Sequence, residues 1–168
     1  MPPASGASGT LGVVPLLVVR HADAYPRSHW EGDDRERPLS PGGRRQALAL
    51  SRRLAVFGPA SVVSSPYARC VETVAPLAAA VGVEVATDWR LAEGAAGEAA
   101  YTLVESLGDG AVLCSHGDVI PALIAELEAR WALDLGANPK FEKGSVWVLH
   151  RPDGRGACAE YLPPLSRH

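Results

Sequence analysis

Short, continuous apolar runs constrain the fold of this chain more than any other feature of its sequence. Residues 16–19 and Ala111–Ser115 are mainly apolar, do not alternate with polar residues, and contain β-branched valines. Such runs are typical of strands that are buried on both faces, as in a parallel sheet. Residues 61–64 and 83–86 form two shorter runs, so we expect four strands of this kind.

Helical patterns separate the apolar runs. A helix is expected to follow Ser40, which would cap its N-terminus, with Pro41 in its first turn. The other expected elements are helices over residues 65–81 and 119–135, a loop running into a helix over residues 90–100, and alternating strands over residues 145–150 and 157–162. Strands that alternate with helices predict a three-layer α/β/α fold, with a mostly parallel sheet and helices on both faces.

The length of 168 residues fits one domain, and no internal repeat or linker divides the chain. Residues 1–12 are rich in Pro, Ala, Ser and Gly, and we expect them to form a flexible tail in front of a single domain over residues 13–168. No stretch has the features of a signal peptide, and none is long and apolar enough to span a bilayer.

Charge and cysteine content limit the classes of partner. The formal net charge of −3 gives no general case for binding nucleic acid or an anionic membrane surface. The three cysteines have no CxxC spacing, which indicates neither a disulfide framework nor a zinc site and fits a reducing compartment. We therefore expect a cytoplasmic protein, and the sequence indicates no particular oligomeric state.

Basic side chains follow three of the expected strands. Arg20 and His21 come directly after residues 16–19, and His116 comes directly after Ala111–Ser115. Arg69 lies near the start of the expected second helix. Ligands bind at the carboxyl edge of parallel sheets, and helix N-termini attract anions. Arginines match the oxygens of a phosphoryl group, and an imidazole nitrogen can attack phosphorus.

Four ordered motifs carry a resemblance to the histidine phosphatase superfamily, also called phosphoglycerate mutase-like. Residues 19–24 resemble its Arg-His-Gly signature, with Ala22 in place of the usual glycine. Residues 37–43 resemble its Pro-Leu-Thr-x-x-Gly helix start, and residues 64–73 resemble its Ser-Ser-Pro-x-x-Arg-x-x-x-Thr segment. Ser115-His116-Gly117 resembles its second His-Gly. The resemblance covers roughly residues 14–150.

The resemblance implies a role for each matching position. His21 would be the nucleophile that becomes phosphohistidine, Arg20 and Arg69 would hold the phosphoryl oxygens, and His116 would donate a further hydrogen bond. Glu93 matches the Leu-x-Glu position, where a carboxylate protonates the leaving group and then activates water. Arg37 is a candidate second phosphate contact. Neither a metal nor another cofactor is implied.

Two branches of the superfamily are especially similar. The short chain and the Arg-Pro-Leu step resemble the SixA phosphohistidine phosphatases, which lack a clear acid at the position of Glu93. Residues 32–39, Arg69-Cys70 and residues 143–149 resemble the phosphatase half of mycobacterial proteins that also carry a MutT-type Nudix domain. Alanine occurs at the position of Ala22 in those relatives, so we do not expect it to inactivate the site.

The resemblance leaves several alternatives open. A mutase that returns the phosphoryl group to an acceptor would be longer, and a phosphate-binding or scaffolding module without turnover would not need the complete set of histidines and arginines. Arg37 is otherwise an exposed loop charge, Glu93 a helix-start carboxylate, and Lys140 and Lys143 solvated lysines. The substrate is a phosphorylated small molecule, a nucleotide or a phosphohistidine protein.

Overall fold

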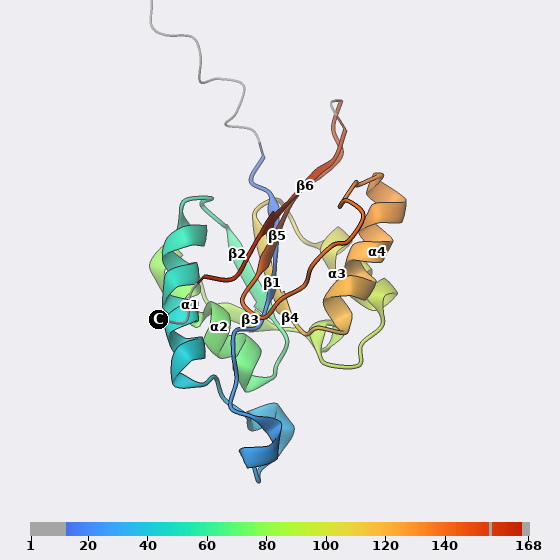
Figure 1. Cartoon of the computed structure of the whole chain (residues 1–168). Helices are drawn as coiled ribbons and strands as arrows, with labels where there is room; N and C mark the ends of the chain where they lie inside the picture. Colours follow the sequence, from blue (N-terminus) through green and yellow to red (C-terminus); the bar gives the residue numbers. More distant parts are fainter. Residues whose placement is uncertain (1–12, 155, 166–168) are drawn as a thin grey trace, which may run out of the picture.

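The computed structural model describes residues 13–154 and 156–165 and contains a six-stranded sheet (Figure 1). In order across the sheet, the strands are β3 (Val85–Thr87), β2 (Ser61–Ser64), β4 (Ala111–Ser115), β1 (Leu16–Arg20), β5 (Val146–His150) and β6 (Cys158–Leu162). The first four are parallel, whereas β5 is antiparallel to both of its neighbours. The predicted tail, residues 1–12, lies outside the described residues.

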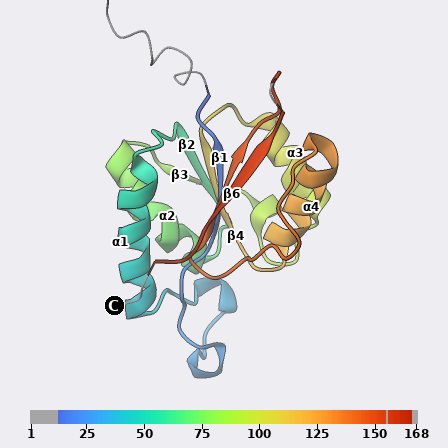
Figure 2. The same cartoon turned by 45° about the horizontal axis from the view of Figure 1, so that its top comes forward.

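Helices cover both faces of the sheet, which confirms the predicted three-layer α/β/α fold (Figures 1 and 2). On one face lie α1 (Pro41–Ala55) and α2 (Ala68–Val81), and on the other lie α3 (Gly97–Ser106) and α4 (Val119–Trp131). No helix in residues 13–154 and 156–165 has the length and apolar content needed to cross a bilayer.

The position of β1 between two layers of helices explains why its sequence is continuously apolar. Leu17 and Val19 pack into the core beneath α1 and α2, whereas Leu16 and Val18 pack into the core beneath α3 and α4. All four side chains are buried. Because alternate side chains of a strand point to opposite faces, a strand with helices on both sides has no position for a polar residue until it ends.

Three helices differ from their predicted positions. The helix expected within residues 90–100 is α3, which begins at Gly97 and continues to Ser106. The last helix ends at Trp131 rather than at residue 135, because Ala132 adopts a left-handed conformation with φ of 54°. The second helix begins at Ala68 rather than at Ser65. Ser65 instead precedes the helix with its side chain buried and turned toward the carboxyl edge of the sheet, where it contacts His116.

The start of α1 is fixed against the loop that follows β1. As predicted, Ser40 caps the helix, because its hydroxyl oxygen accepts a hydrogen bond of 3.0 Å from the N–H of Gly43. The same hydroxyl donates to a carboxylate oxygen of Asp23 at 2.7 Å. A Cβ atom at Gly43 would lie 1.8 Å from the carbonyl oxygen of Asp23, so only glycine allows this close approach.

Candidate active site

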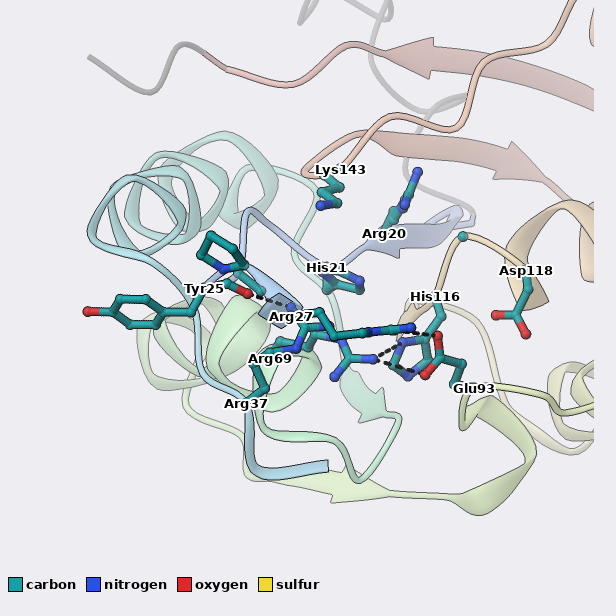
Figure 3. A pocket seen from close by; sticks show the side chains of 13 residues that line it. Arg20, His21, Tyr25, Arg27, Arg37, Arg69, Glu93, His116, Asp118 and Lys143 are labelled. Atoms are coloured by element: carbon teal, nitrogen blue, oxygen red, sulfur yellow. Dashed lines mark hydrogen bonds and ion pairs between the residues drawn. The ribbon is translucent and has the colours of Figure 1, made fainter. Parts of the chain in front are cut away.

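A cavity of about 480 Å³ opens at the carboxyl edge of the sheet (Figure 3). All six side chains predicted from the sequence line this cavity: Arg20, His21, Arg37, Arg69, Glu93 and His116. The remaining lining residues are Ala24, Tyr25, Pro26, Arg27, Gly117, Asp118 and Lys143. Five cationic side chains and two carboxylates therefore surround the cavity, a balance that favours an anionic ligand.

The parallel pairing of β1 with β4 brings the two histidines together. Arg20 lies beside Ser115 in the ladder, and the N–H of His21 donates to the carbonyl of Ser115 at 3.1 Å. The next residue on the second strand is His116, whose ring centroid lies 5.5 Å from that of His21 in an edge-on arrangement. Both rings therefore lie together at the carboxyl edge of the sheet, where the two strands end.

A chain of hydrogen bonds orients the ring of His21. With the proton on Nδ1, this nitrogen donates to the carbonyl of Ala22 at 2.8 Å, which leaves the lone pair on Nε2. The N–H of Ala22 donates to Oγ1 of Thr73 at 3.0 Å, and this hydroxyl donates to the carbonyl of Arg69 at 2.6 Å. The threonine of the 64–73 motif therefore connects the loop of His21 to α2.

The side chain of Ala22 also has a defined place. Ala22 is fully buried and packs with Leu39 and Ala47 in a small apolar cluster. Since this cluster accommodates the methyl group, the departure from the usual glycine does not disturb the loop.

Burial keeps the imidazole of His21 neutral. The pKa of His21 is lowered from 6.5 to about 3, and desolvation is the largest cause. The charges of His116, Arg69 and Arg20 act in the same direction, whereas the hydrogen bond to Ala22 acts against it. A neutral ring with Nδ1 engaged has a free lone pair on Nε2, which is the state that a nucleophile requires.

Arg69 is the most deeply buried cation of the site, with 1% of its surface exposed. Its Nη1 donates to the carbonyl of Asp34 at 2.9 Å. Its Nη2 lies 3.2 Å from a carboxylate oxygen of Asp34 and 3.2 Å from one of Glu93. Within the described residues, its Nε and that of Arg20 are buried without a hydrogen-bond partner. Buried N–H groups of this kind favour an anionic acceptor.

Arg37 is not the exposed loop charge that was the alternative, because only 7% of it is exposed. Its Nε donates to Oδ1 of Asp34 at 2.8 Å, and its Nη1 donates to the carbonyl of Tyr25 at 2.6 Å. Arg27 also approaches Asp34, at 3.6 Å. One carboxylate thus holds three arginines, counting Arg69, at one side of the cavity.

Arg20 lies at the side of the cavity opposite to the other three arginines (Figure 3). The position of its guanidinium depends on a glycine. Its Nη1 donates to the carbonyl of Phe141 at 2.6 Å. A Cβ atom at Gly117 would lie 2.7 Å from the central carbon of the guanidinium. The glycine of the second His-Gly motif therefore provides the space that the guanidinium of Arg20 occupies.

His116 is 2% exposed and is held from beneath. Its Nε2 lies 2.8 Å from the hydroxyl of Ser65 and 3.6 Å from the sulfur of Cys70. Its Nδ1 lies 3.5 Å from Nη2 of Arg69. Nδ1 is therefore the nitrogen on the side of the arginine, and Ser65 fixes the plane of the ring.

Glu93 comes from the loop between the 3₁₀ helix η3 (Trp89–Leu91) and α3. Its Oε1 lies 3.4 Å from Nη2 of Arg27, and its other oxygen faces Arg69. The carboxylate therefore bridges two arginines at the mouth of the cavity (Figure 3).

The comparisons with known proteins decide the family. The model of the histidine phosphatase superfamily (branch 1) matches residues 16–106, more than half of the chain. The chain belongs to the histidine phosphatase superfamily. Three of the four motifs lie within the matched residues. The membership confirms the predicted superfamily and the predicted class of enzyme, a hydrolase of phosphate esters.

An 8-oxo-(d)GTP phosphatase of Mycolicibacterium smegmatis is 37% identical to this histidine phosphatase over 158 residues. The match covers 89% of this chain and 48% of the relative, so the chain spans about half the length of that protein. The similarity is in line with the predicted likeness to mycobacterial proteins.

Solved structures of other histidine phosphatases have the same fold. The SixA protein of Nakamurella multipartitia is 24% identical, with a TM-score of 0.69 over 92% of this chain and 98% of that chain. A SixA solved with tungstate is 19% identical, with a TM-score of 0.69 over 90% and 96% of the two chains. A mycobacterial glucosyl-3-phosphoglycerate phosphatase is 21% identical, with a TM-score of 0.65 over 87% and 96%.

Several lining residues of this histidine phosphatase were not predicted. Lys143, expected to be solvated, lines the cavity, whereas Lys140 lies in a separate groove beside Trp147. Arg27, which belongs to no motif, also lines it. Asp34 is not among the lining residues, but it contacts Arg37 and Arg69 and was not predicted either. The signal for Asp34 was its place within the stretch of residues 32–39 that resembles the mycobacterial relatives.

The low pKa of His21 predicts a specific acid sensitivity of the phosphatase. Below pH 6.5 the unfolded chain binds a proton at this histidine, whereas the folded chain does not until about pH 3. The free energy of unfolding therefore falls with decreasing pH in this window. Relative to pH 7.5, the wild type at pH 5 should lose about 2 kcal/mol more than His21→Gln, which cannot titrate. Urea unfolding at both pH values measures this difference. Equal losses in the two proteins would contradict a neutral, buried His21.

Proposed function

We propose that this chain transfers a phosphoryl group from a phosphorylated small molecule to His21 and then to water. The observation that carries the proposal is the neutral His21 ring, with Nδ1 held by Ala22, in a cavity lined by arginines. In the first step, Nε2 forms a bond to phosphorus while the bond to the leaving oxygen breaks, and the leaving group takes up a proton. In the second, water attacks phosphorus, the N–P bond breaks and a proton is released.

Arg20, Arg69 and His116 stabilise the charge that develops on the phosphoryl oxygens. The two guanidiniums offer unpaired buried N–H groups beside His21, and such preorganised donors lower the barrier to phosphoryl transfer. The hydroxyl of Ser65, 2.8 Å from Nε2 of His116, donates to that nitrogen in the loaded site. Nδ1 of His116 then carries the proton and donates it in a hydrogen bond to the phosphoryl group.

The substrate is a phosphorylated small molecule, and we favour a nucleotide. A cavity of about 480 Å³ has the size of a small-molecule site. The relative from Mycolicibacterium smegmatis carries the name of a nucleotide phosphatase. Arg27, Arg37 and Lys143 provide cations beyond those that one phosphoryl group needs. We place the reaction in the cytoplasm, because the free thiols of the chain suit a reducing compartment.

Trapping the phosphoenzyme tests the proposal. Rapid quenching with a labelled aryl phosphate should yield a covalent adduct that is acid-labile and base-stable, as a phosphohistidine is. The adduct should form equally in the presence of EDTA, because the arginines supply the charge stabilisation. It should be absent from His21→Gln. An adduct in that variant would place the nucleophile elsewhere, and a wild type that binds phosphate without forming an adduct would indicate a binding module.

Glu93 is proposed to act on the leaving group and then on water. Glu93→Gln should slow alkyl phosphates by roughly 10²- to 10⁴-fold, the usual contribution of a positioned acid or base. Aryl phosphates should slow much less, because phenoxide leaves without a proton. Steady-state kinetics with both classes measures the contrast. Equal slowing would restrict Glu93 to hydrolysis of the phosphoenzyme, and unchanged rates would leave it a purely structural partner of Arg69 and Arg27.

A further inference from the structure

A second cavity, of about 210 Å³, adjoins the catalytic cavity and has no role in the steps above. Its lining residues are Arg27, Trp30, Gly32, Asp34 and Glu93. We propose that this cavity is the subsite for the nucleobase of a nucleotide substrate, which stacks on Trp30 while the phosphoryl group lies at His21. The proposal rests on the proposed phosphatase function and defines which part of the substrate the second cavity takes.

The two cavities meet at one pair of residues. Arg27 and Glu93 line both of them, and their side chains lie 3.4 Å apart. A substrate whose phosphorus is next to His21 therefore extends past this pair when its leaving group enters the second cavity. On that path the guanidinium of Arg27, which is largely exposed, is available to a phosphate or a ribose oxygen between the two ends.

Trp30 is held in one orientation by its own loop. Its Nε1 donates to the carbonyl of Asp33 at 2.9 Å. The backbone of Gly32 lies against the indole, since a Cβ atom there would be 3.2 Å from the ring atoms Cζ2 and Nε1. Trp30 is half-buried and belongs to none of the three apolar clusters that form the described core. A large aromatic ring that is fixed but contributes nothing to the core is preorganised for stacking.

The charges of the second cavity favour a nucleobase over another phosphate. The carboxylates of Asp34 and Glu93 line it together with a single cation, Arg27. Five cationic side chains line the catalytic cavity, so a phosphate group is bound more favourably at His21 than here. A planar ring with N–H donors on its edge suits both features: its face packs on the indole, and its donors face carboxylate oxygens. Guanine, with adjacent N–H and NH₂ donors, has this chemistry.

The test compares a substrate that has a base with one that lacks it. The probes are guanosine 5′-diphosphate and acetyl phosphate, each with wild type, Trp30→Ala, Trp30→Phe and Trp89→Ala. Trp30→Ala should lower kcat/KM for the nucleotide by about 5- to 150-fold, the range for loss of one stacked base, and leave acetyl phosphate unchanged. Trp30→Phe should restore most of the loss. Trp89, which is 63% exposed and lines neither cavity, is the matched control.

A binding measurement separates this proposal from the catalytic one. In the His21→Gln background, where no turnover is expected, calorimetry with guanosine 5′-diphosphate should show the same fold loss of affinity on addition of Trp30→Ala. Equal effects of Trp30→Ala on the nucleotide and on acetyl phosphate, or no effect on either, would overturn the subsite. Turnover of a phosphohistidine peptide but not of the nucleotide would also overturn it, together with the choice of a small-molecule substrate, while leaving phosphoryl transfer through His21 intact. Hydrolysis of acetyl phosphate by His21→Gln would overturn that function alone.

Discussion

Replacing His21 by glutamine is expected to lower kcat by roughly 10⁴- to 10⁶-fold, the range for enzymes that lose a nucleophile or its activating base. Glutamine keeps a polar side chain of similar reach but has no nitrogen lone pair that can form an N–P bond. The measurement is steady-state hydrolysis of an aryl phosphate, with the folded state checked by circular dichroism. The loss should be large because, among the described residues, His116 is the only other histidine that lines the cavity, and it is proposed to donate a hydrogen bond and not to act as the nucleophile.

A second histidine provides the control for this result. His150 ends β5 and does not line the cavity, so His150→Gln should retain the wild-type kcat. A residual rate in His21→Gln within about tenfold of the wild type would contradict covalent catalysis at His21. Such a rate would indicate direct attack of water on a phosphate held by the arginines.

Replacing Arg69 by alanine is expected to lower kcat by roughly 10²- to 10³-fold, as for the loss of one strong transition-state donor. Arg69 is almost fully buried, lines the cavity with both histidines, and lies 3.5 Å from Nδ1 of His116. Its Nε group has no hydrogen-bond partner among the described residues. Its removal also takes from Asp34 and Glu93 the buried cation that they share and leaves the more exposed Arg27 as their common partner. Arg69→Lys should recover only part of the rate, because an ammonium cannot make a bidentate contact.

Arg37 provides the comparison for Arg69. Both arginines contact Asp34, but Arg37 uses two of its N–H groups for Asp34 and Tyr25. Arg37→Ala should therefore mainly raise KM and leave kcat nearly unchanged. The two roles would be exchanged if Arg37→Ala lowered kcat while Arg69→Ala changed only KM. Kinetics at saturating substrate distinguish the two patterns.

The fold and the centre of the site could be predicted because their signals are local. Apolar runs such as residues 16–19 identify strands buried on both faces, and Ser40 followed by Pro41 identifies a helix start. The motifs around His21, Arg69 and His116 each occupy a strand end or a helix start, and parallel pairing brings such ends to one edge.

The periphery of the site could not be predicted, because its contacts are distant in sequence. Asp34 contacts Arg69, which lies 35 residues further along the chain. No pattern within the charged loop of Asp34 indicates which arginines its carboxylate will contact. The last helix ends at Trp131, earlier than predicted, because Ala132 adopts a left-handed conformation that is unusual for alanine. No glycine stands at this position to indicate the end of the helix. Trp30 lies in a loop without a sequence motif, and its role depends on a loop conformation in which the carbonyl of Asp33 fixes its ring.

The two carboxylates that hold Arg69 have a consequence for the end of the reaction. Asp34 and Glu93 each lie 3.2 Å from the guanidinium of Arg69. Their carboxylates therefore compete with inorganic phosphate for the same N–H groups. A product that must compete with carboxylates already in place binds less tightly than it would to an unopposed arginine. The empty site is thereby stabilised, phosphate release becomes easier, and weak product inhibition is built into the same contacts that keep the cation in position.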